Sequence, residues 1–288
     1  RTVYDLASLT KVVATTTAVM LLVEDGLMEL DRPVRDYLPE FSGGTKDHIT
    51  IRHLLTHTSG LPAGASIRAP TPEAALARAW DTRLLRSPGS RVVYSDIGFI
   101  VLAAAAERAA GEPLYRLLDR RVFGPLGMRS TTFLPGEWCG RCAPTDERRD
   151  GTFIQGVVHD PLAQQLGGIA GHAGLFSTVH DLARFAAMLA RGGELDGVRV
   201  LEERTVRLFT ERQPGADTRA LGWDTPDPRG LGAAGQRISP RSFGHTGFTG
   251  TSMWIDPDRG TWTILLSNRT FRPRSPNRMQ ALRRQVND

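Results

Sequence analysis

Hydrophobic residues in the first half of the chain follow helical patterns. Residues 7–25 are apolar on nearly every face, which is typical of a helix buried in a protein core, and Gly26 supplies its stop. Alanine-rich or amphipathic stretches predict further helices at residues 51–57, 72–85, 97–110 and 113–122. The block from about residue 50 to 125 is therefore predicted to be helical.

The last third of the chain has short alternating runs instead. A capping-box pattern at Thr178 and Asp181 predicts a helix that ends at residues 192–193. Strands are predicted at residues 221–224, 243–246, 251–255 and 261–267, with a hairpin turn between the last two. A final helix is predicted from about residue 277. Strands clustered in this way favour an antiparallel sheet over alternating βα units.

These elements predict an α+β fold with two parts. We expect residues 1–49 and 166–288 to form a sheet domain, in which the first and last helices flank the sheet. Residues 50–165 are expected to form an inserted helical domain with its connecting loops. No internal repeat or low-complexity linker interrupts the chain.

Composition and charge narrow the classes of partner. The 288 residues carry a net charge of +5, and the basic residues are scattered among acidic ones, so nucleic-acid binding is not expected. The longest apolar run, at residues 12–23, contains three threonines and is short for a bilayer-spanning helix, so no membrane span is expected. Lysine occurs only at Lys11 and Lys46. Arginine serves wherever a permanent charge is enough, so a lysine kept beside a serine suggests proton chemistry.

Ser8 and Lys11 are the first candidate catalytic pair. Three residues apart on a helix, they lie on the same face. A serine hydroxyl is a poor nucleophile unless a neighbouring base takes its proton. Lysine is such a base only if burial lowers its pKa from about 10.4 toward 7, and the apolar helix makes this setting plausible. Ser8 also lies in the first helical turn, where free N–H groups can hold an oxyanion.

The sequence does not support a redox centre, a zinc site or an α/β-hydrolase nucleophile. Cys139 and Cys142 are flanked by loop-type sequence, so a local disulfide or two free thiols is expected instead of a redox centre. His53 and His57 have the spacing of a helical zinc pair, but Leu54 stands where a metalloprotease needs glutamate. We interpret that segment as packing and expect no metal site. No Gly-x-Ser-x-Gly motif occurs, which excludes an α/β-hydrolase nucleophile elbow.

Two later motifs join the serine–lysine pair. The tripeptide YSD begins at Tyr94 at the start of a predicted helix, and HTG begins at His245 on a predicted strand. A serine–lysine pair, then Tyr-x-Asn, then Lys-Thr-Gly, in this order, is the signature of penicillin-binding proteins and class C-like β-lactamases, and this sequence resembles that family. The likeness covers essentially the whole chain and extends to LLTHTSGLP at residues 54–62 and GHAGLFS at residues 171–177.

The resemblance implies an acyl-enzyme on Ser8, formed without a metal or an organic cofactor. Lys11 and Tyr94 would share the general-base and proton-relay work, and the sequence does not decide between them. A phenol with a pKa of about 10 serves as a base only if nearby cations favour its anion. The backbone N–H groups of Ser8 and Phe248 would form the oxyanion hole.

His245 is a further candidate catalytic residue, on a strand that would form the far wall of the cleft. Asp96, Thr246 and Gly247 are candidate substrate contacts. His172, in a glycine-rich loop that approaches the active site in relatives, is a further candidate for substrate binding. Two residues depart from the family motifs: His245 replaces a lysine and Asp96 replaces an asparagine. Histidine is a weaker, pH-dependent cation, and an ionised aspartate cannot donate a hydrogen bond. We therefore expect poor β-lactam hydrolysis, with Asp96 repelling a substrate carboxylate if it faces the cleft.

These features predict a carboxylesterase or a DD-carboxypeptidase-like hydrolase that acts on esters or D-alanyl amides. The alternatives are a β-lactamase and, in another class, a non-catalytic penicillin- or peptidoglycan-binding sensor. The expected partners are an ester, a peptidoglycan stem peptide or a β-lactam. The resemblance favours an extracytoplasmic location, periplasmic or secreted. Because relatives carry strands ahead of the nucleophile helix and few residues precede Ser8, we expect the sheet to lack N-terminal strands.

Overall fold

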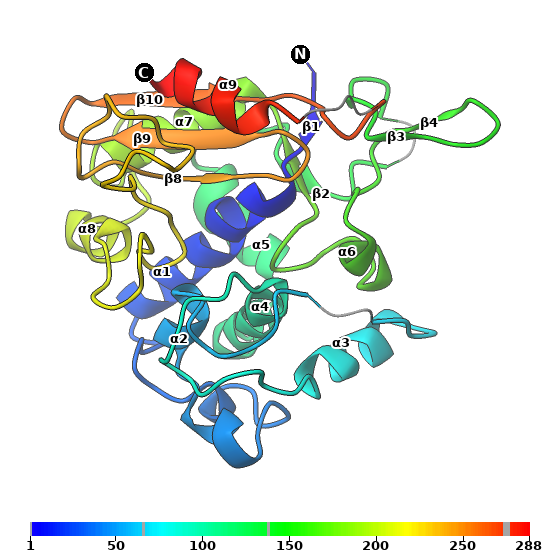
Figure 1. The fold of residues 1–288 in the computed structure, drawn as a ribbon, viewed down its shortest axis with the longest axis vertical. Helices are drawn as coiled ribbons and strands as arrows, with labels where there is room; N and C mark the ends of the chain where they lie inside the picture. Colours follow the sequence, from blue (N-terminus) through cyan, green and yellow to red (C-terminus); the bar gives the residue numbers. More distant parts are fainter. Residues whose placement is uncertain (1, 65–66, 137–138, 273–276) are drawn as a thin grey trace.

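The computed structural model describes residues 2–64, 67–136, 139–272 and 277–288. Figure 1 shows an antiparallel sheet at one end of the molecule and helices α2, α3 and α4 toward the other end. The helical segments are η1 (Ala7–Leu9), η2 (Lys11–Thr16), α1 (Thr17–Glu24), η3 (Val34–Asp36), η4 (Gly44–His48), α2 (Ile51–Leu55), α3 (Pro72–Trp80), α4 (Asp96–Ala110), α5 (Leu114–Leu118), η5 (Asp119–Phe123), α6 (Pro161–Gln165), α7 (Val179–Ala190), α8 (Glu203–Thr210) and α9 (Met279–Asn287). The strands are β1 (Tyr4–Asp5), β2 (Thr132–Phe133), β3 (Asp146–Glu147), β4 (Phe153–Ile154), β5 (Leu175–Ser177), β6 (Glu194–Leu195), β7 (Val198–Arg199), β8 (Phe243–Thr246), β9 (Ser252–Asp256) and β10 (Thr261–Leu265).

The larger sheet has the antiparallel order β10-β9-β8 within the described ranges. The strands predicted at residues 243–246, 251–255 and 261–267 are confirmed to within two residues, as is their hairpin turn. The strand predicted at residues 221–224 is wrong. Gly222 has a left-handed backbone (φ 83°), and its N–H donates to the carbonyl of Leu55 instead of to a neighbouring strand. Only single bridges through Asp224 remain there.

A smaller sheet has the order β1-β5-β2, and its strand β1 leads into the segment that carries Ser8. The central strand β5 pairs antiparallel with β1, where Tyr4 lies opposite Ser177, and with β2. These strands of two or three residues are too short to show a hydrophobic period, so sequence patterns did not predict them. β2 comes from the predicted inserted domain and pairs with β5 of the predicted sheet domain. The division of the chain at residues 49/50 and 165/166 stays a prediction.

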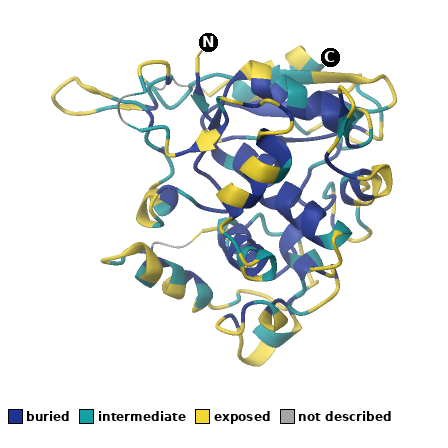
Figure 2. Cartoon of the chain, turned by 180° about the vertical axis from the view of Figure 1, so that it is seen from behind, coloured by how far each residue is buried: buried dark blue, intermediate teal, exposed yellow. Residues whose placement is uncertain are grey.

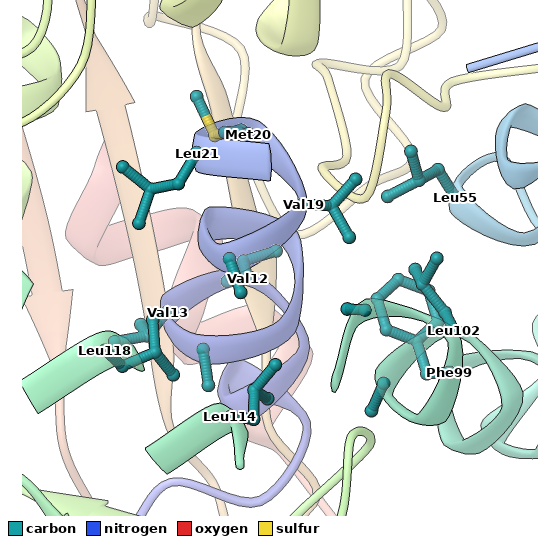
Figure 3. Packing of buried hydrophobic residues seen from close by; sticks show 14 of the residues in the cluster. Val12, Val13, Val19, Met20, Leu21, Leu55, Phe99, Leu102, Leu114 and Leu118 are labelled. Atoms are coloured by element: carbon teal, nitrogen blue, oxygen red, sulfur yellow. The ribbon is translucent and has the colours of Figure 1, made fainter. Parts of the chain in front are cut away.

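The segment predicted as one buried helix at residues 7–25 is confirmed in place but not in geometry. It begins as the 3₁₀ turn η1, continues as the π-helical η2 and ends as α1. Figure 2 shows that buried residues gather at the centre of the molecule, and Figure 3 shows side chains of this segment packed against α4 and α5. π-Helical turns are rare and frequently occur at functional sites. Here that turn begins at Lys11.

The central segment also corrects the expectation about apolar length. Ala7–Glu24 is long and apolar enough to cross a membrane by those two measures alone, and among the described residues it is the one helical stretch that is. Of that stretch, 83% is buried inside the protein, where it forms the core.

The first and last helical segments both contact the sheet, and α7 packs on it as well. α9 packs on β10, as expected of the last helix, while α7 packs against both β9 and β10. The first helical segment meets the sheet at its start, where η1 lies against β8. The predicted capping box of α7 is half formed. Thr178 accepts the N–H of Asp181, but the Asp181 carboxylate accepts from Ser130 and Thr131 instead.

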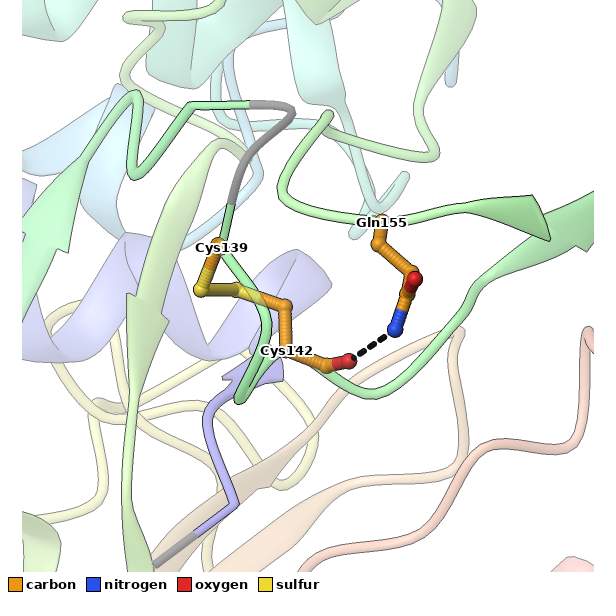
Figure 4. Close-up of a disulfide and its surroundings, with 3 residues drawn as sticks. All are labelled: Cys139, Cys142 and Gln155. Atoms are coloured by element: carbon orange, nitrogen blue, oxygen red, sulfur yellow. Dashed lines mark hydrogen bonds between the residues drawn. A yellow bond between two sulfur atoms is a disulfide. The ribbon is translucent and has the colours of Figure 1, made fainter.

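Cys139 and Cys142 form a disulfide, which resolves the two alternatives left by the sequence (Figure 4). Their Cα atoms lie 5.4 Å apart. The Gln155 side chain donates to the Cys142 carbonyl at 2.8 Å, and the backbone of Val3 pairs with this loop on either side of Cys142. The disulfide therefore braces a loop that contacts the strand leading into the nucleophile.

Candidate functional site

The backbone around Ser8 is held by a buried aspartate. The residue before it, Ala7, has a left-handed backbone (φ 47°), which is uncommon for a residue other than glycine. The Ala7 N–H donates to the Asp5 carboxylate at 2.8 Å, and the His159 N–H donates to its other oxygen at 2.7 Å. Burial raises the pKa of Asp5, although these two hydrogen bonds act in the opposite direction. Ser8 itself is half-buried and lines a cleft of about 430 Å³.

Lys11 lies behind Ser8 and is fully buried. Its Nζ donates to Ser8 Oγ at 3.2 Å, to Asp96 Oδ1 at 2.6 Å and to the His172 carbonyl at 3.1 Å. It also lies 4.8 Å from the centre of the Tyr94 ring. The structure thus brings together residues from the start of the chain, from the first turn of α4 and from the glycine-rich loop.

The prediction that burial lowers the pKa of Lys11 toward neutrality is wrong in direction. Burial does act to lower the pKa, but interactions with Tyr94 and with the Asp96 carboxylate outweigh it, so the pKa of Lys11 is raised. Lys11 is therefore an ammonium at neutral pH. The sequence argument failed because it considered the apolar helix and not the acidic partner.

Tyr94 and Asp96 reach the site from the start of α4. Ser95 caps this helix, accepting the Gly98 N–H at 3.0 Å and donating to the Pro62 carbonyl at 2.6 Å. Tyr94 lines the same cleft as Ser8. Asp96 faces Lys11, and its charge is paired there, so the expectation that it repels substrate loses its basis.

His245 is a buried, neutral wall residue. Its Nδ1 hydrogen-bonds with the Thr246 carbonyl at 2.8 Å, and its ring centre lies 5.9 Å from that of Tyr94. Burial, and then the positive charges of Arg219 and Lys11, lower the pKa of His245 well below its ordinary value. It therefore cannot replace the lysine charge of the family motif at neutral pH, as the sequence indicated.

The remainder of the third motif forms the rim of the cleft. Thr246, Gly247 and the exposed Phe248 line the cleft together with Ser8. In the part of the chain that the structure describes, the backbone N–H groups of Ser8 and Phe248 donate to no other protein group.

Two threonines just beyond this rim connect it to the nucleophile segment. The Thr249 hydroxyl donates to the Asp5 carbonyl at 2.8 Å, and the Thr251 hydroxyl donates to the Leu6 carbonyl at 3.0 Å.

His172 does not line the cleft with the other candidates. Its ring is buried, and Nε2 hydrogen-bonds with Asp160 at 2.8 Å. Burial raises the pKa of Asp160, but the hydrogen bond and charge of His172 outweigh it and bring the pKa to about 2. His172 contributes its carbonyl to Lys11 instead, so it supports the site through its backbone.

Three arginines that sequence reasoning missed also line the cleft. Arg219 lies over the Tyr94 ring at 5.4 Å, and Arg269 lies over the Phe248 ring at 4.1 Å. Arg283 donates to the Gly247 carbonyl at 2.7 Å. Arginine is the common base of this chain, so these positions carry no distinguishing signal in the sequence.

The described residues contain no group of three or more His, Cys, Asp and Glu side chains that could hold a metal ion. His53 is used locally, where its Nδ1 accepts the Thr50 N–H at 3.1 Å and caps α2. His57 lies against Tyr94 with ring centres 4.5 Å apart, so the segment interpreted as packing reaches the site.

The chain is similar to known proteins in sequence and in fold. The model of the beta-lactamase family matches residues 1–288. A protein of Salmonella agona (strain SL483), named "Putative D-alanyl-D-alanine carboxypeptidase", is 33% identical over 304 residues, which cover 94% of this chain and 70% of the relative. The structure of a beta-lactamase from Mycobacterium bovis has a TM-score of 0.69 at 26% identity and covers 99% of this chain and 85% of that one.

A penicillin-binding protein homologue from Caulobacter crescentus aligns with a TM-score of 0.75 at 23% identity, over 93% of this chain and 78% of that one, and shows the same fold. The resemblance read from the three motifs is confirmed, and so is the α+β fold class. The chain therefore belongs to the beta-lactamase family of serine hydrolases.

Proposed function

We propose that this chain is a serine carboxypeptidase that cleaves a D-alanyl amide bond whose leaving group ends in a carboxylate. The observation that carries the proposal is the cleft at Ser8, whose lining includes Arg219, Arg269 and Arg283 against one acidic residue, Asp224. Such a cleft has a net positive charge even though His245 is neutral, and it fits an anionic substrate. The curated relative from Salmonella agona carries a name of this activity.

In the proposed acylation step, Ser8 Oγ attacks the amide carbonyl and the C–N bond breaks after a tetrahedral intermediate. Lys11 stays protonated because its interactions with Tyr94 and Asp96 raise its pKa, so it stabilises negative charge near Ser8 Oγ and is not the base. Tyr94, whose ring lies near the cations of Lys11 and Arg219, reacts as its phenolate, which accepts the serine proton and passes it to the leaving nitrogen. The N–H groups of Ser8 and Phe248 hold the oxyanion. Water then releases the acyl group by the reverse proton path.

The leaving group's carboxylate is assigned to Arg219. Its side chain is only 17% exposed, and its nearest acidic partner, Asp224, is 4.0 Å away, so the guanidinium can also bind an anion. Asp224 Oδ1 is itself engaged by the Thr218 hydroxyl at 2.6 Å. Arg269 and Arg283 donate to backbone carbonyls of the rim and add charge without being the direct ligand.

A paired set of peptides tests this assignment. The substrates are an acylated L-lysyl-D-alanyl-D-alanine peptide and the same peptide with its terminal carboxylate amidated. Wild type should release D-alanine from the first and be about tenfold to a hundredfold slower in kcat/KM on the second, the value of one charge-assisted contact. Arg219→Gln should remove that difference. Arg241→Gln, an exposed arginine paired with Asp258, is the matched control and should preserve it.

Other outcomes of the panel point elsewhere. Equal rates on both peptides, or no effect of Arg219→Gln, would contradict the carboxylate site. Turnover of p-nitrophenyl esters alone would indicate a carboxylesterase, and faster turnover of a chromogenic cephalosporin than of the peptide would indicate a β-lactamase. Covalent labelling of Ser8 by penicillin without turnover of any substrate would indicate a sensor.

A further inference from the structure

His57 has a backbone conformation that is uncommon for residues other than glycine. It follows the last turn of α2 with a left-handed backbone (φ 58°). Glycine is the usual residue at this place after a helix, because it adopts the conformation without a steric penalty. A histidine in this conformation lowers the stability of the fold, and ending the helix does not offset that loss. The side chain is therefore expected to have a further role.

The contacts of His57 converge on the two neighbours of Tyr94. Its carbonyl accepts the Val93 N–H at 2.8 Å, and its ring Nδ1 accepts the Ser95 N–H at 3.0 Å. Its ring packs on the Tyr94 ring at 4.5 Å and on Phe99 at 5.1 Å. Because a backbone N–H donates to Nδ1, this nitrogen carries no proton and the ring proton is on Nε2.

These contacts hold a part of the backbone that no helix or strand holds. Residues 91–95 belong to no helix or strand, so the backbone that carries Tyr94 is not held by a helix or sheet ladder. His57 is buried, with 1% of its surface exposed, so it presents a fixed surface to that segment. A phenol that relays a proton must lie within hydrogen-bond reach of its partners, and misplacement by about 1 Å is enough to cost a hundredfold in rate.

We propose that His57 is a positioning residue for Tyr94, which it fixes by binding the backbone on both sides of the tyrosine and by stacking on its ring. This inference rests on the proton-relay role of Tyr94 in the proposed function. It assigns the histidine of the LLTHTSGLP segment to the proton relay and not to packing alone. Its charge plays no part, because burial and then the positive charges of Arg219 and Lys11 lower the pKa of His57 well below its ordinary value.

The test compares His57→Gly with His57→Asn on two substrates. Glycine accepts the left-handed backbone but removes the ring and its acceptor, while asparagine tolerates this backbone and retains an acceptor oxygen. We expect His57→Gly to lower kcat for the D-alanyl peptide about a hundredfold with little change in KM. The loss on a p-nitrophenyl ester should be smaller, because its leaving group departs without protonation. His57→Asn should recover at least part of the peptide rate, and it serves as the test variant if glycine prevents folding.

A matched control, His53, lies about one turn earlier, within α2. His53 also accepts a backbone N–H through Nδ1, but that N–H belongs to Thr50. His53→Ala should change the two substrates equally, if it changes them at all. A double-mutant cycle with Tyr94→Phe completes the test, because His57→Gly should cost little further once the phenol hydroxyl is gone.

Three results would overturn the inference: wild-type peptide turnover in a folded His57→Gly variant, equal losses on peptide and ester, or full additivity with Tyr94→Phe. A Tyr94→Phe variant as active as wild type has a different meaning. It would overturn the relay role of Tyr94 in the proposed function, and the inference would fail with it.

Discussion

Replacing Asp96 by asparagine removes the charge at the centre of the site and little else. Asp96 Oδ1 lies 2.6 Å from the fully buried Lys11 Nζ, while 29% of the Asp96 side chain is exposed. Asparagine keeps the shape and one acceptor oxygen, and it is the residue of the family motif. We expect the folded protein to lose stability at neutral pH, because a buried ammonium is left without its counter-charge.

The size of this loss follows from burial and exposure. Removing one partner of a fully buried ion pair costs about 3–5 kcal/mol. Partial exposure of Asp96 screens the pair, and the Ser8 and His172 oxygens still accept from Lys11 in the variant. A loss of about 2–3 kcal/mol at pH 7 is therefore expected, above the value of about 1 kcal/mol or less for an exposed pair.

The pH dependence gives a second signature. The pKa of Lys11 is raised in the wild type, so its stabilisation is complete below the ordinary lysine value of about 10.4 and is lost as the pH rises through the folded pKa. In Asp96→Asn the raising influence of Asp96 is gone while burial, the largest single influence, remains, so the pKa of Lys11 is lower than in the wild type. The lysine of the variant therefore loses its proton at lower pH, which relieves the cost of the unpaired ammonium there. The difference between wild type and variant should narrow from pH 7 toward pH 10.

Urea unfolding of both proteins between pH 6 and pH 10 measures this difference. Asp31→Asn is the control: Asp31 binds Arg52 at 2.7 Å but its side chain is 74% exposed, so we expect a small loss that does not change with pH over this range. A variant as stable as wild type, or a difference that is constant with pH, would refute the account of the ion pair.

Three further predictions concern the site and its surroundings. Lys11→Arg should lower acylation on the order of a thousandfold or more, because a planar guanidinium does not fit the three point contacts of the ammonium; wild-type labelling by fluorescent penicillin would remove Lys11 from the mechanism. Asp96→Asn with His245→Lys should raise kcat/KM for a cephalosporin relative to a p-nitrophenyl ester by about tenfold or more, and no relative gain would contradict the role given to His245. Asp160→Asn should cost about 1–2 kcal/mol at pH 7, with a difference that shrinks as the pH falls from about 4 toward 2, since the pKa of Asp160 is lowered to about 2. Thermal melts at pH 7, 5 and 3 check this, and an unchanged gap at pH 3 would contradict it.

The sequence predicted those site residues that belong to uncommon local patterns. A serine three positions before one of two lysines is a local signal, and the tyrosine and the HTG strand followed in the family's order. The structure places Ser8, Tyr94, Thr246 and Gly247 on one cleft, as the motifs indicated. Long periodic helices such as α4 were predicted to within a residue, because their apolar faces repeat many times.

What the sequence could not reveal depends on contacts between distant positions. Lys11 and Asp96 are 85 positions apart, and their pairing reverses the expected direction of the pKa shift. Arg219 belongs to a segment that shows no chemical signal, and the sequence suggested only packing for His57, until folding places both against the Tyr94 ring. β1 and β5 were missed because two or three residues do not establish a period.

The threonine bonds beyond the cleft rim have a consequence for how the enzyme adapts to substrates. Thr249 and Thr251 bind the carbonyls of Asp5 and Leu6, just before the nucleophile, so these bonds hold the far wall and the nucleophile segment together. A bulkier acyl group cannot push them apart without breaking both bonds. The side of the cleft that carries Tyr94, on an irregular segment, must then change to fit the bulkier acyl group. Selection for a new acyl group is therefore expected to alter that segment first and to leave the strand wall unchanged.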